Sequence, residues 1–282
     1  MKKKYFLFSL FVLFFSCDSQ NDYSVVNTSE KIYIVSPNEG DFKSINEAVQ
    51  IVPPGSVILI EKGVYNESIH AFNKEIHLIG EDRENCIIQN STGSYETPPI
   101  EINKGSLRNL TFYAKEGTST NERGWTDYSI HNDDNSSYCA SLIIDNCNFI
   151  SEMNYSLGMG VRGGYYLLAR NCNFINKGNL GCIFFHDGTE SDYAGLAHII
   201  FENCIFSNTI NPIIRIDTMR DYNITYMTFI ACNFETKSRI DGKCDYVLFN
   251  ESGLEANGWL NQLRNVFLTK MSKNNNLSDF NF

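Results

Sequence analysis

Short apolar runs alternate with polar turns through the second half of the chain, and each run ends in the same four-residue word. The copies recur at a spacing of roughly 25 to 32 residues. The four clear copies are Asn146-Cys147-Asn148-Phe149, Asn171-Cys172-Asn173-Phe174, Asn203-Cys204-Ile205-Phe206 and Ala231-Cys232-Asn233-Phe234. Self-similarity at this spacing is typical of a solenoid, in which each unit buries its apolar side against its neighbours. Because the units are strands and turns without a helical period, the pattern predicts a β-helix.

The word itself has a physical meaning on a strand. Its Cys and Phe lie two positions apart, so both point to the same face. Stacked coils would therefore build one ladder of Cys and one of Phe inside the tube. The Asn residues suit tight turns, where Asn adopts left-handed backbone geometry or hydrogen-bonds along the stack. We expect these cysteines to act as small buried hydrophobes, with no disulfide framework, and Cys86 to stand apart from them.

The region before the repeats is expected to close the end of the solenoid. Apolar positions on one face predict a helix over residues 41–50, with Asp41 as N-cap and Pro53-Pro54-Gly55 ending it. Alternating runs predict strands at 32–35, 57–60, 64–69, 75–80 and 86–88. A helix that covers an open β-stack protects its exposed edges. The sequence thus predicts an all-β solenoid with an N-terminal capping helix.

The amino terminus has the pattern of a processing signal. Three lysines at 2–4 precede an apolar stretch from Tyr5 to Phe15, which is too short to span a bilayer as a finished helix. Ser16 and Cys17 then resemble the end of a bacterial lipoprotein signal. We expect a signal peptide at 1–16, lipidation of Cys17, a flexible tether at 17–30, the solenoid at 31–269 and a tail at 270–282. The expected location is the bacterial cell envelope, and a plain secretory signal is the alternative.

Charge limits the class of partner. The chain has 23 basic and 33 acidic side chains, for a formal charge of −10. Removing residues 1–16 removes three lysines, which leaves 20 basic groups and a charge of −13. This argues against nucleic acid, because phosphate binding needs a basic footprint. It also weighs against a strongly polyanionic glycan unless a local basic patch overrides the net field.

The cap carries a family resemblance. The motifs are the segment from Asp41 to Ala48, then Pro54-Gly55-Ser56, the segment from Lys62 to Glu67, and the segment from His77 to Glu81. Together they resemble the opening of pectinesterase-type proteins and, more widely, of the pectate-lyase-like superfamily. The resemblance implies a single-stranded right-handed parallel β-helix. It covers about residues 32–90 closely and extends loosely to about residue 250.

The resemblance also implies where catalytic residues would lie. Pectinesterases use two Asp residues on neighbouring coils, with a Gln at the oxyanion and an Arg beside the nucleophile. Their first word, Gln-Asp-Thr, is matched by His186-Asp187-Gly188-Thr189, so Asp187 corresponds to the acid/base and His186 replaces the Gln. Their second word, Gly-x-x-Asp-Phe-x-Phe-Gly, has no counterpart after Phe206.

The repeats give an independent prediction of the site. Aligning the strands that follow each word, at 128–133, 157–163, 181–188, 212–218 and 245–252, places their polar ends in one column. The column would contain His131, Asn132, Arg162, His186, Asp187, Arg215, Asp217, Asn250 and Glu251. Coils about 4.8 Å apart would make Asp187 and Asp217 neighbours, one with a raised pKa and one ionised. The distance between the two carboxylates would distinguish a nucleophilic mechanism from a water-mediated one.

These observations lead to a carbohydrate-active protein facing a polysaccharide, with uronate-containing polysaccharides among the candidates. In the catalytic version, Asp187 and Asp217 are acid/base and nucleophile, supported by Arg162, Arg215 and His186. The substrate-contacting set would be His131, Asn132, Asn250, Tyr193 and Tyr222. The chemistry leans to a pectinesterase-like esterase or a polysaccharide lyase, and the alternative is a non-catalytic glycan-binding or scaffold protein. We expect a monomer with no metal or cofactor (calcium only for a lyase), attached to the membrane through Cys17.

Overall fold

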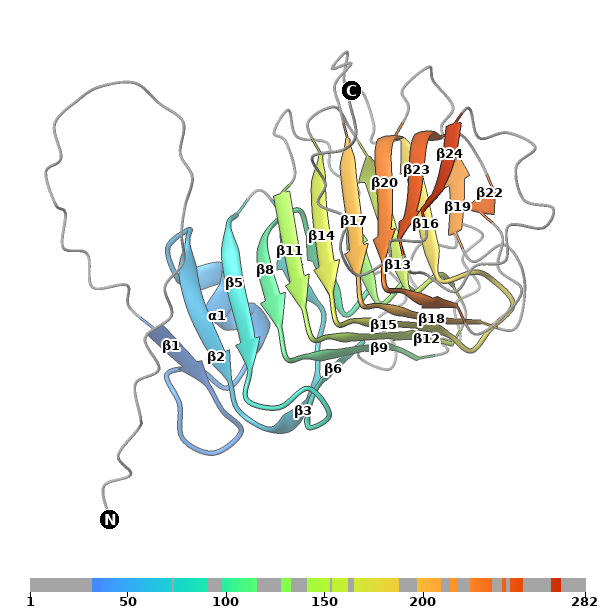
Figure 1. Ribbon diagram of the computed structural model, residues 1–282. Coiled ribbons are helices and arrows are strands. Elements are labelled where there is room, and N and C mark those ends of the chain that lie inside the picture. Colours follow the sequence, from blue (N-terminus) through green and yellow to red (C-terminus); the bar gives the residue numbers. More distant parts are fainter. Residues whose placement is uncertain are drawn as a thin grey trace, which may run out of the picture. The chain divides into compact units, whose positions relative to one another are not determined.

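The computed structural model describes thirteen segments of the chain, all within the compact unit Lys31–Phe282. They are residues 32–72, 74–90, 98–115, 128–132, 141–152, 154–161, 165–187, 197–208, 214–217, 224–234, 240–241, 244–250 and 265–269. Within them, short strands follow one another around a tube, and one short helix lies near its amino-terminal end (Figure 1). This confirms the predicted right-handed parallel β-helix with a capping helix.

Three parallel sheets form the walls of the tube, and successive strands of the chain pass from one sheet to the next. Sheet A contains β1 (Ile32–Val35), β2 (Ser56–Ile60), β5 (Ile76–Gly80), β8 (Lys104–Arg108), β11 (Ser141–Asp145), β14 (Tyr166–Arg170), β17 (His198–Glu202), β20 (Ile224–Ile230), β23 (Cys244–Asn250) and β24 (Asn265–Thr269). Sheet B contains β3 (Gly63–Asn66), β6 (Cys86–Gln89), β9 (Thr111–Ala114), β12 (Asn148–Ser151), β15 (Asn173–Asn176), β18 (Ile205–Asn208) and β21 (Asn233–Phe234). Sheet C contains β4 (Ile69–Ala71), β7 (Ile100–Ile102), β10 (Ile130–Asn132), β13 (Leu157–Val161), β16 (Ile183–Asp187), β19 (Ile214–Asp217) and β22 (Ile240–Asp241).

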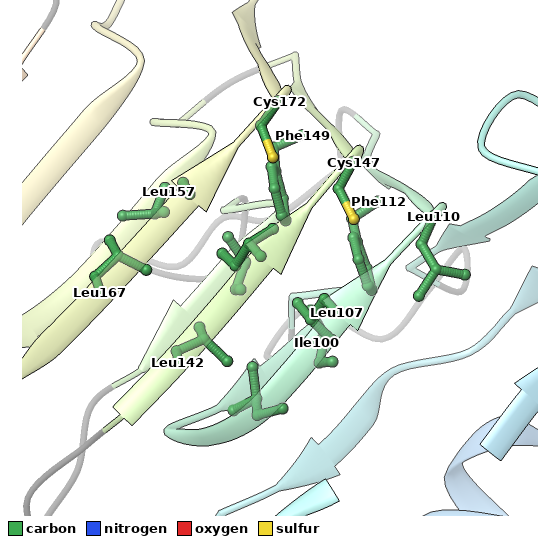
Figure 2. Packing of buried hydrophobic residues seen from close by; sticks show 14 of the residues in the cluster. Ile100, Leu107, Leu110, Phe112, Leu142, Cys147, Phe149, Leu157, Leu167 and Cys172 are labelled. Atoms are coloured by element: carbon green, nitrogen blue, oxygen red, sulfur yellow. The ribbon is translucent and has the colours of Figure 1, made fainter. Parts of the chain in front are cut away.

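The repeated word builds the ladders that its spacing predicts. The Phe rings of sheet B stack from coil to coil, with centroids 5.4 Å apart for Phe112 and Phe149 and 5.3 Å apart for Phe149 and Phe174. The Cys side chains lie beside these rings in the core, as Figure 2 shows for Cys147 and Cys172. Every described cysteine with a placed side chain is buried, and none of these forms a disulfide. Burial raises the pKa of Cys147 to about 12, so this thiol stays neutral.

Cys86 belongs to the same column, contrary to the expectation that it stands apart. It begins β6, and its neighbour Ile87 pairs with Thr111, which makes Cys86 level with Leu110. Leu110 in turn precedes Thr111, the partner of Asn148, and so lies level with Cys147. One leucine therefore separates Cys86 from the rest of the cysteine ladder.

The Asn at the start of each word makes the turn from sheet A to sheet B. Its backbone is left-handed at Asn146, Asn171 and Asn203, and also at Asn109 of a fainter copy, Asn109-Leu110-Thr111-Phe112, with φ between 51° and 54°. The side chains also bond along the stack: Asn146 Nδ2 donates to Asn109 Oδ1 at 2.8 Å, and Asn203 Nδ2 donates to Asn171 Oδ1 at 2.7 Å. Both expected roles of Asn are thus confirmed. Ala231 holds the same conformation, with φ 49°, without a side chain that can join the ladder.

Helix α1 (Ile45–Ile51) packs Ile45, Ala48 and Val49 into the core at the end of the tube. The predicted N-cap is wrong: the helix begins four residues after Asp41, which instead accepts a hydrogen bond from the backbone of Ile34. Ser44 is the N-cap, and its Oγ accepts from Glu47 N at 3.1 Å. In the described part of the chain, no helix is long and apolar enough to cross a membrane.

Glu67 connects two of the cap motifs. Its carboxylate accepts hydrogen bonds from the backbone N–H groups of Ile45 and Asn46, at 2.9 Å and 3.0 Å, and from Ser44 Oγ. The first N–H groups of a helix have no partner within the helix, and a carboxylate also complements the helix dipole. Glu67 therefore joins two of the motifs that carry the family resemblance, the segment from Asp41 to Ala48 and the segment from Lys62 to Glu67.

Candidate functional site

The register of sheet C aligns one row of residues along the tube, and we call it the outer row. Each strand contributes one member, and the members are His70, Glu101, His131, Gly158, Phe184, Arg215 and Asp241. The positions on either side of this row, such as Ile183, Phe185 and Ile214, are buried in the core. Alternation along a strand therefore directs the outer row away from the interior.

At its amino-terminal end the outer row holds three ionisable groups on consecutive strands. Nδ1 of His70 lies 2.6 Å from Glu101 Oε2, and Nδ1 of His131 lies 3.9 Å from Glu101 Oε1. The side chains are 41%, 15% and 5% exposed for His70, Glu101 and His131. Burial opposes ionisation of Glu101, but the imidazoles of His131 and His70 more than offset it and hold the pKa of this carboxyl below its usual range.

The ring of Tyr128 lies over Gly158, the member of the outer row after His131. Tyr128 stacks on His131 with ring centroids 5.1 Å apart and planes 13° apart. A Cβ atom at Gly158 would come within 2.5 Å of the Tyr128 ring. Glycine is therefore required at position 158 for Tyr128 to lie flat beside His131.

Phe184 and Arg215 continue the row toward the carboxyl-terminal end. Tyr155 stacks on Phe184 with centroids 5.3 Å apart, and the Arg215 guanidinium lies 5.5 Å from the centre of the Phe184 ring. Arg215 is exposed. A cation over an aromatic face is held in place without losing its charge, so Arg215 can still attract an anion.

Four of the five predicted catalytic residues, His186, Asp187, Arg215 and Asp217, lie on β16 and β19. The register of these strands does not make Asp187 and Asp217 level. Asp217 pairs with His186, which in turn pairs with Gly160. Asp187 pairs with Val161, one position further along. The backbone thus aligns His186 with Asp217, while the side chains of His186, Asp187 and Asp217 are not among those the structure describes. Arg215 precedes Asp217 by two positions on β19.

Two predicted contact residues lie elsewhere than the column analysis placed them. Asn132 pairs with the buried Met159, and its side chain is inside the tube with 1% exposure and no hydrogen-bond partner among the described residues. The prediction that it faces a glycan is therefore wrong, because it stands one position beyond His131 and alternation turns it inward. Asn250 ends β23 in sheet A, paired with Ile230, and so does not belong to the column.

The remaining predictions fall on residues that the structure does not describe. They are Arg162, Tyr193, Tyr222, Glu251 and Cys17. Among the described residues, no group of three or more His, Cys, Asp or Glu side chains is arranged to hold a metal ion.

Sequence reasoning missed His70, Glu101 and Phe184. The sequence does contain a signal for the first two. Ile69-His70-Ala71 and Ile100-Glu101-Ile102 each begin with isoleucine followed by an ionisable residue, as Ile130-His131-Asn132 does. These triplets precede the clear copies of the repeated word, so the word could not align them. Phe184 was passed over because its triplet has an aromatic residue at the outer position.

We compared the chain with known proteins and solved structures. No family model matches the chain. Pectinesterase A of Dickeya dadantii is 39% identical over 91 residues, which cover 29% of this chain and 25% of that protein, so the chain spans about a quarter of the length of this curated relative. The crystal structure of Escherichia coli YbhC is similar with a TM-score of 0.52 at 12% identity, over 85% of this chain and 76% of that one. A pectin methylesterase from Yersinia enterocolitica is similar with a TM-score of 0.51 at 17% identity, over 77% of this chain and 81% of that one.

The strand order, the ladders and these similarities agree with one another. This chain has the pectinesterase-like parallel β-helix fold.

Proposed function

We propose that the protein acts on a polysaccharide that lies against the outer row of sheet C, as a pectinesterase-like carbohydrate esterase. The fold and the similarity to Pectinesterase A support this class. The observation that carries the proposal is the register of β16 and β19, which aligns His186 with Asp217 two positions after the exposed Arg215.

The proposed chemistry is acyl transfer from a sugar methyl ester. In this scheme the Asp217 carboxylate attacks the ester carbonyl, and His186 donates to the oxygen that becomes negative. Asp187 would protonate the departing methanol and then activate water. Arg215 and Arg162 would keep the nucleophile ionised, because a neighbouring positive charge favours a carboxylate over a carboxylic acid.

A second candidate is a glycan-binding protein without catalysis. Two observations favour it: the register sets Asp187 one position away from the level of Asp217, and the second pectinesterase word has no counterpart after Phe206. In this version the outer row still contacts the polysaccharide, and no ester is hydrolysed.

We also propose that the mature protein is anchored at the bacterial cell envelope by lipid on Cys17. The basic, apolar and small-residue order of residues 1–17 supports this. Expression with a labelled fatty acid should label the wild-type protein and leave Cys17→Ser unlabelled. A Cys17→Ser variant that takes up as much label as the wild type would contradict the anchor.

A product screen separates the candidate functions. Purified protein is incubated with methyl-esterified pectin, polygalacturonate and neutral glycans, with and without calcium, while methanol and unsaturated sugars are measured. Methanol release without unsaturated product is the result expected of the esterase. Unsaturated product that requires calcium would indicate a lyase, and binding without any product would favour the second candidate.

A further inference from the structure

We propose that His70, Glu101 and His131 form a subsite that binds the carboxylate of a uronate residue through the exposed Nε2 of His70. This inference rests on the proposed function, since it assigns a role to part of the outer row at a distance from β16 and β19. From β4 to β19 the row crosses five strand spacings, which is about 24 Å at roughly 4.8 Å per strand.

The geometry fixes which atom of His70 is available to a ligand. Nδ1 is used by Glu101 at 2.6 Å, so the ring is held with Nε2 on its opposite side. The backbone of His70 is held as well, because its N–H donates to Asn46 Oδ1 at 3.0 Å and its carbonyl accepts from Gln50 Nε2 at 2.7 Å. Nε2 has no hydrogen-bond partner among the described residues, and the side chain is 41% exposed. An oriented ring with one nitrogen free is suited to binding.

The cluster contains one carboxylate and two imidazoles, and few other groups of the described residues contact them. Glu101 lies between them, Tyr128 stacks on His131, and α1 contacts His70 through the uncharged side chains of Asn46 and Gln50. With Glu101 ionised, the cluster carries −1 when both imidazoles are neutral and +1 when both are protonated. Imidazole changes charge between about pH 5 and 8, whereas a sugar carboxylate remains ionised across that range.

Burial distinguishes this cluster from an ordinary surface ion pair. Exposed pairs contribute little to stability and need no further role. Here Glu101 and His131 are mostly buried, and a buried charge is costly unless it is paired. The cost falls on two consecutive strands, β7 and β10, where the flanking residues Ile100, Ile102 and Ile130 are buried and apolar. A structural role alone would be served by apolar or uncharged residues at these positions.

The ligand class follows from the chemistry of the exposed nitrogen. A protonated Nε2 donates a charge-assisted hydrogen bond, which a carboxylate accepts more strongly than a hydroxyl does. Arg215 at the other end of the row is a second cation that does not depend on pH. A polyuronate that contacts both would be bound by one permanent and one protonation-dependent site.

The test uses His70→Asn, because the Asn amide can replace Nδ1 in the bond to Glu101 but has no counterpart of Nε2. His77→Asn is the matched control: His77 lies on sheet A, bonds Ser106 through Nδ1 at 2.9 Å, and has its Nε2 3.7 Å from Glu75 Oε1. Binding of polygalacturonate oligomers to the full chain is measured by calorimetry at pH 5 and pH 8, at constant ionic strength. Methyl-esterified oligomers provide an uncharged reference.

We expect wild type and His77→Asn to bind polygalacturonate about fivefold more tightly at pH 5 than at pH 8, and His70→Asn to lose this difference. Equal pH dependence in His70→Asn and wild type would overturn the subsite, as would equal gains for charged and esterified oligomers. Methanol release from methyl-esterified pectin, measured on the same preparations, tests the proposed function separately. If wild type releases methanol but its binding does not depend on pH, the subsite alone is refuted. If wild type neither binds the oligomers nor releases methanol, both proposals are refuted.

Discussion

Ala231 is the position at which the turn ladder is incomplete, and Ala231→Asn should stabilise the protein. Ala231 has the left-handed φ of 49° that Asn has at the same turn in the four preceding coils. This conformation costs a residue with a Cβ roughly 1–2 kcal/mol, and it costs Asn less. Asn203 donates its Nδ2 to Asn171, while its own N–H bonds to the carbonyl of Ile230, directly before Ala231. A new Asn at 231 can therefore donate to Asn203 Oδ1.

The expected gain combines two contributions. Relief at the backbone is a fraction of the left-handed cost, and one further side-chain hydrogen bond contributes about 1 kcal/mol net. The sum is about 1.5 kcal/mol. For a domain of this size, that corresponds to a rise in Tm of about 3–6 °C. Urea denaturation followed by circular dichroism gives the same quantity as a shift of the midpoint at constant slope.

Ala231→Gly separates the two contributions. Glycine removes the Cβ and with it the left-handed cost, but it adds no hydrogen bond and increases the entropy of the unfolded chain. We expect Ala231→Asn to be more stable than both wild type and Ala231→Gly. An Ala231→Asn protein no more stable than Ala231→Gly would refute the ladder contribution, and one less stable than wild type would refute the account of this turn.

Three further predictions concern the core and the outer row. Phe174→Ala should cost about 3–5 kcal/mol in denaturant unfolding, because its buried ring stacks on Phe149 and Phe206; a loss below about 1 kcal/mol would contradict the stacked core. The lowered pKa of Glu101 means that its contribution to stability is present at neutral pH and is lost as pH falls from about 4.3 through the lower folded value. Thermal unfolding of Glu101→Gln should therefore differ from wild type at pH 7 and converge with it in acid, and a constant difference would contradict this. Cys147 should resist thiol reagents at pH 8 until the protein unfolds, because burial raises its pKa to about 12; mass spectrometry showing labelled Cys147 in the native protein would contradict it.

The repeated word made the core of the solenoid predictable from sequence. Strand alternation dictates that Cys147 and Phe149 share a face, and the structure places both inside. The Asn before each Cys combines tolerance of left-handed backbone with an amide that bonds along the stack. Both properties belong to the residue and its immediate neighbours, so they can be derived without tertiary contacts.

The capping helix shows where local reasoning was insufficient. Asp41 is a good N-cap by type, yet its carboxylate bonds to the backbone of β1, and the helix begins after Ser44. The deciding partner is Glu67, which is 23 residues from Ser44. No local pattern identifies a contact at that separation.

The candidate site was predicted in part for a similar reason. Aligning the residues after each word identified β13, β16 and β19 correctly as strands of one sheet. The alignment was wrong at Asn250, because the strand of sheet C described after the last clear word is β22, and Asn250 lies on β23 in sheet A. His70 and Glu101 precede the repeats, and their alignment with His131 follows only from the register of β4, β7 and β10.

The most direct test of the proposed esterase is methanol release from methyl-esterified pectin by wild type, Asp217→Asn and Glu202→Gln. Glu202 is an exposed carboxylate on sheet A and controls for loss of one negative charge. The account predicts release by wild type and Glu202→Gln, and a loss of at least about 100-fold in Asp217→Asn, which lacks the nucleophile. Release by Asp217→Asn at the wild-type rate, or no release by any of the three proteins, would contradict it.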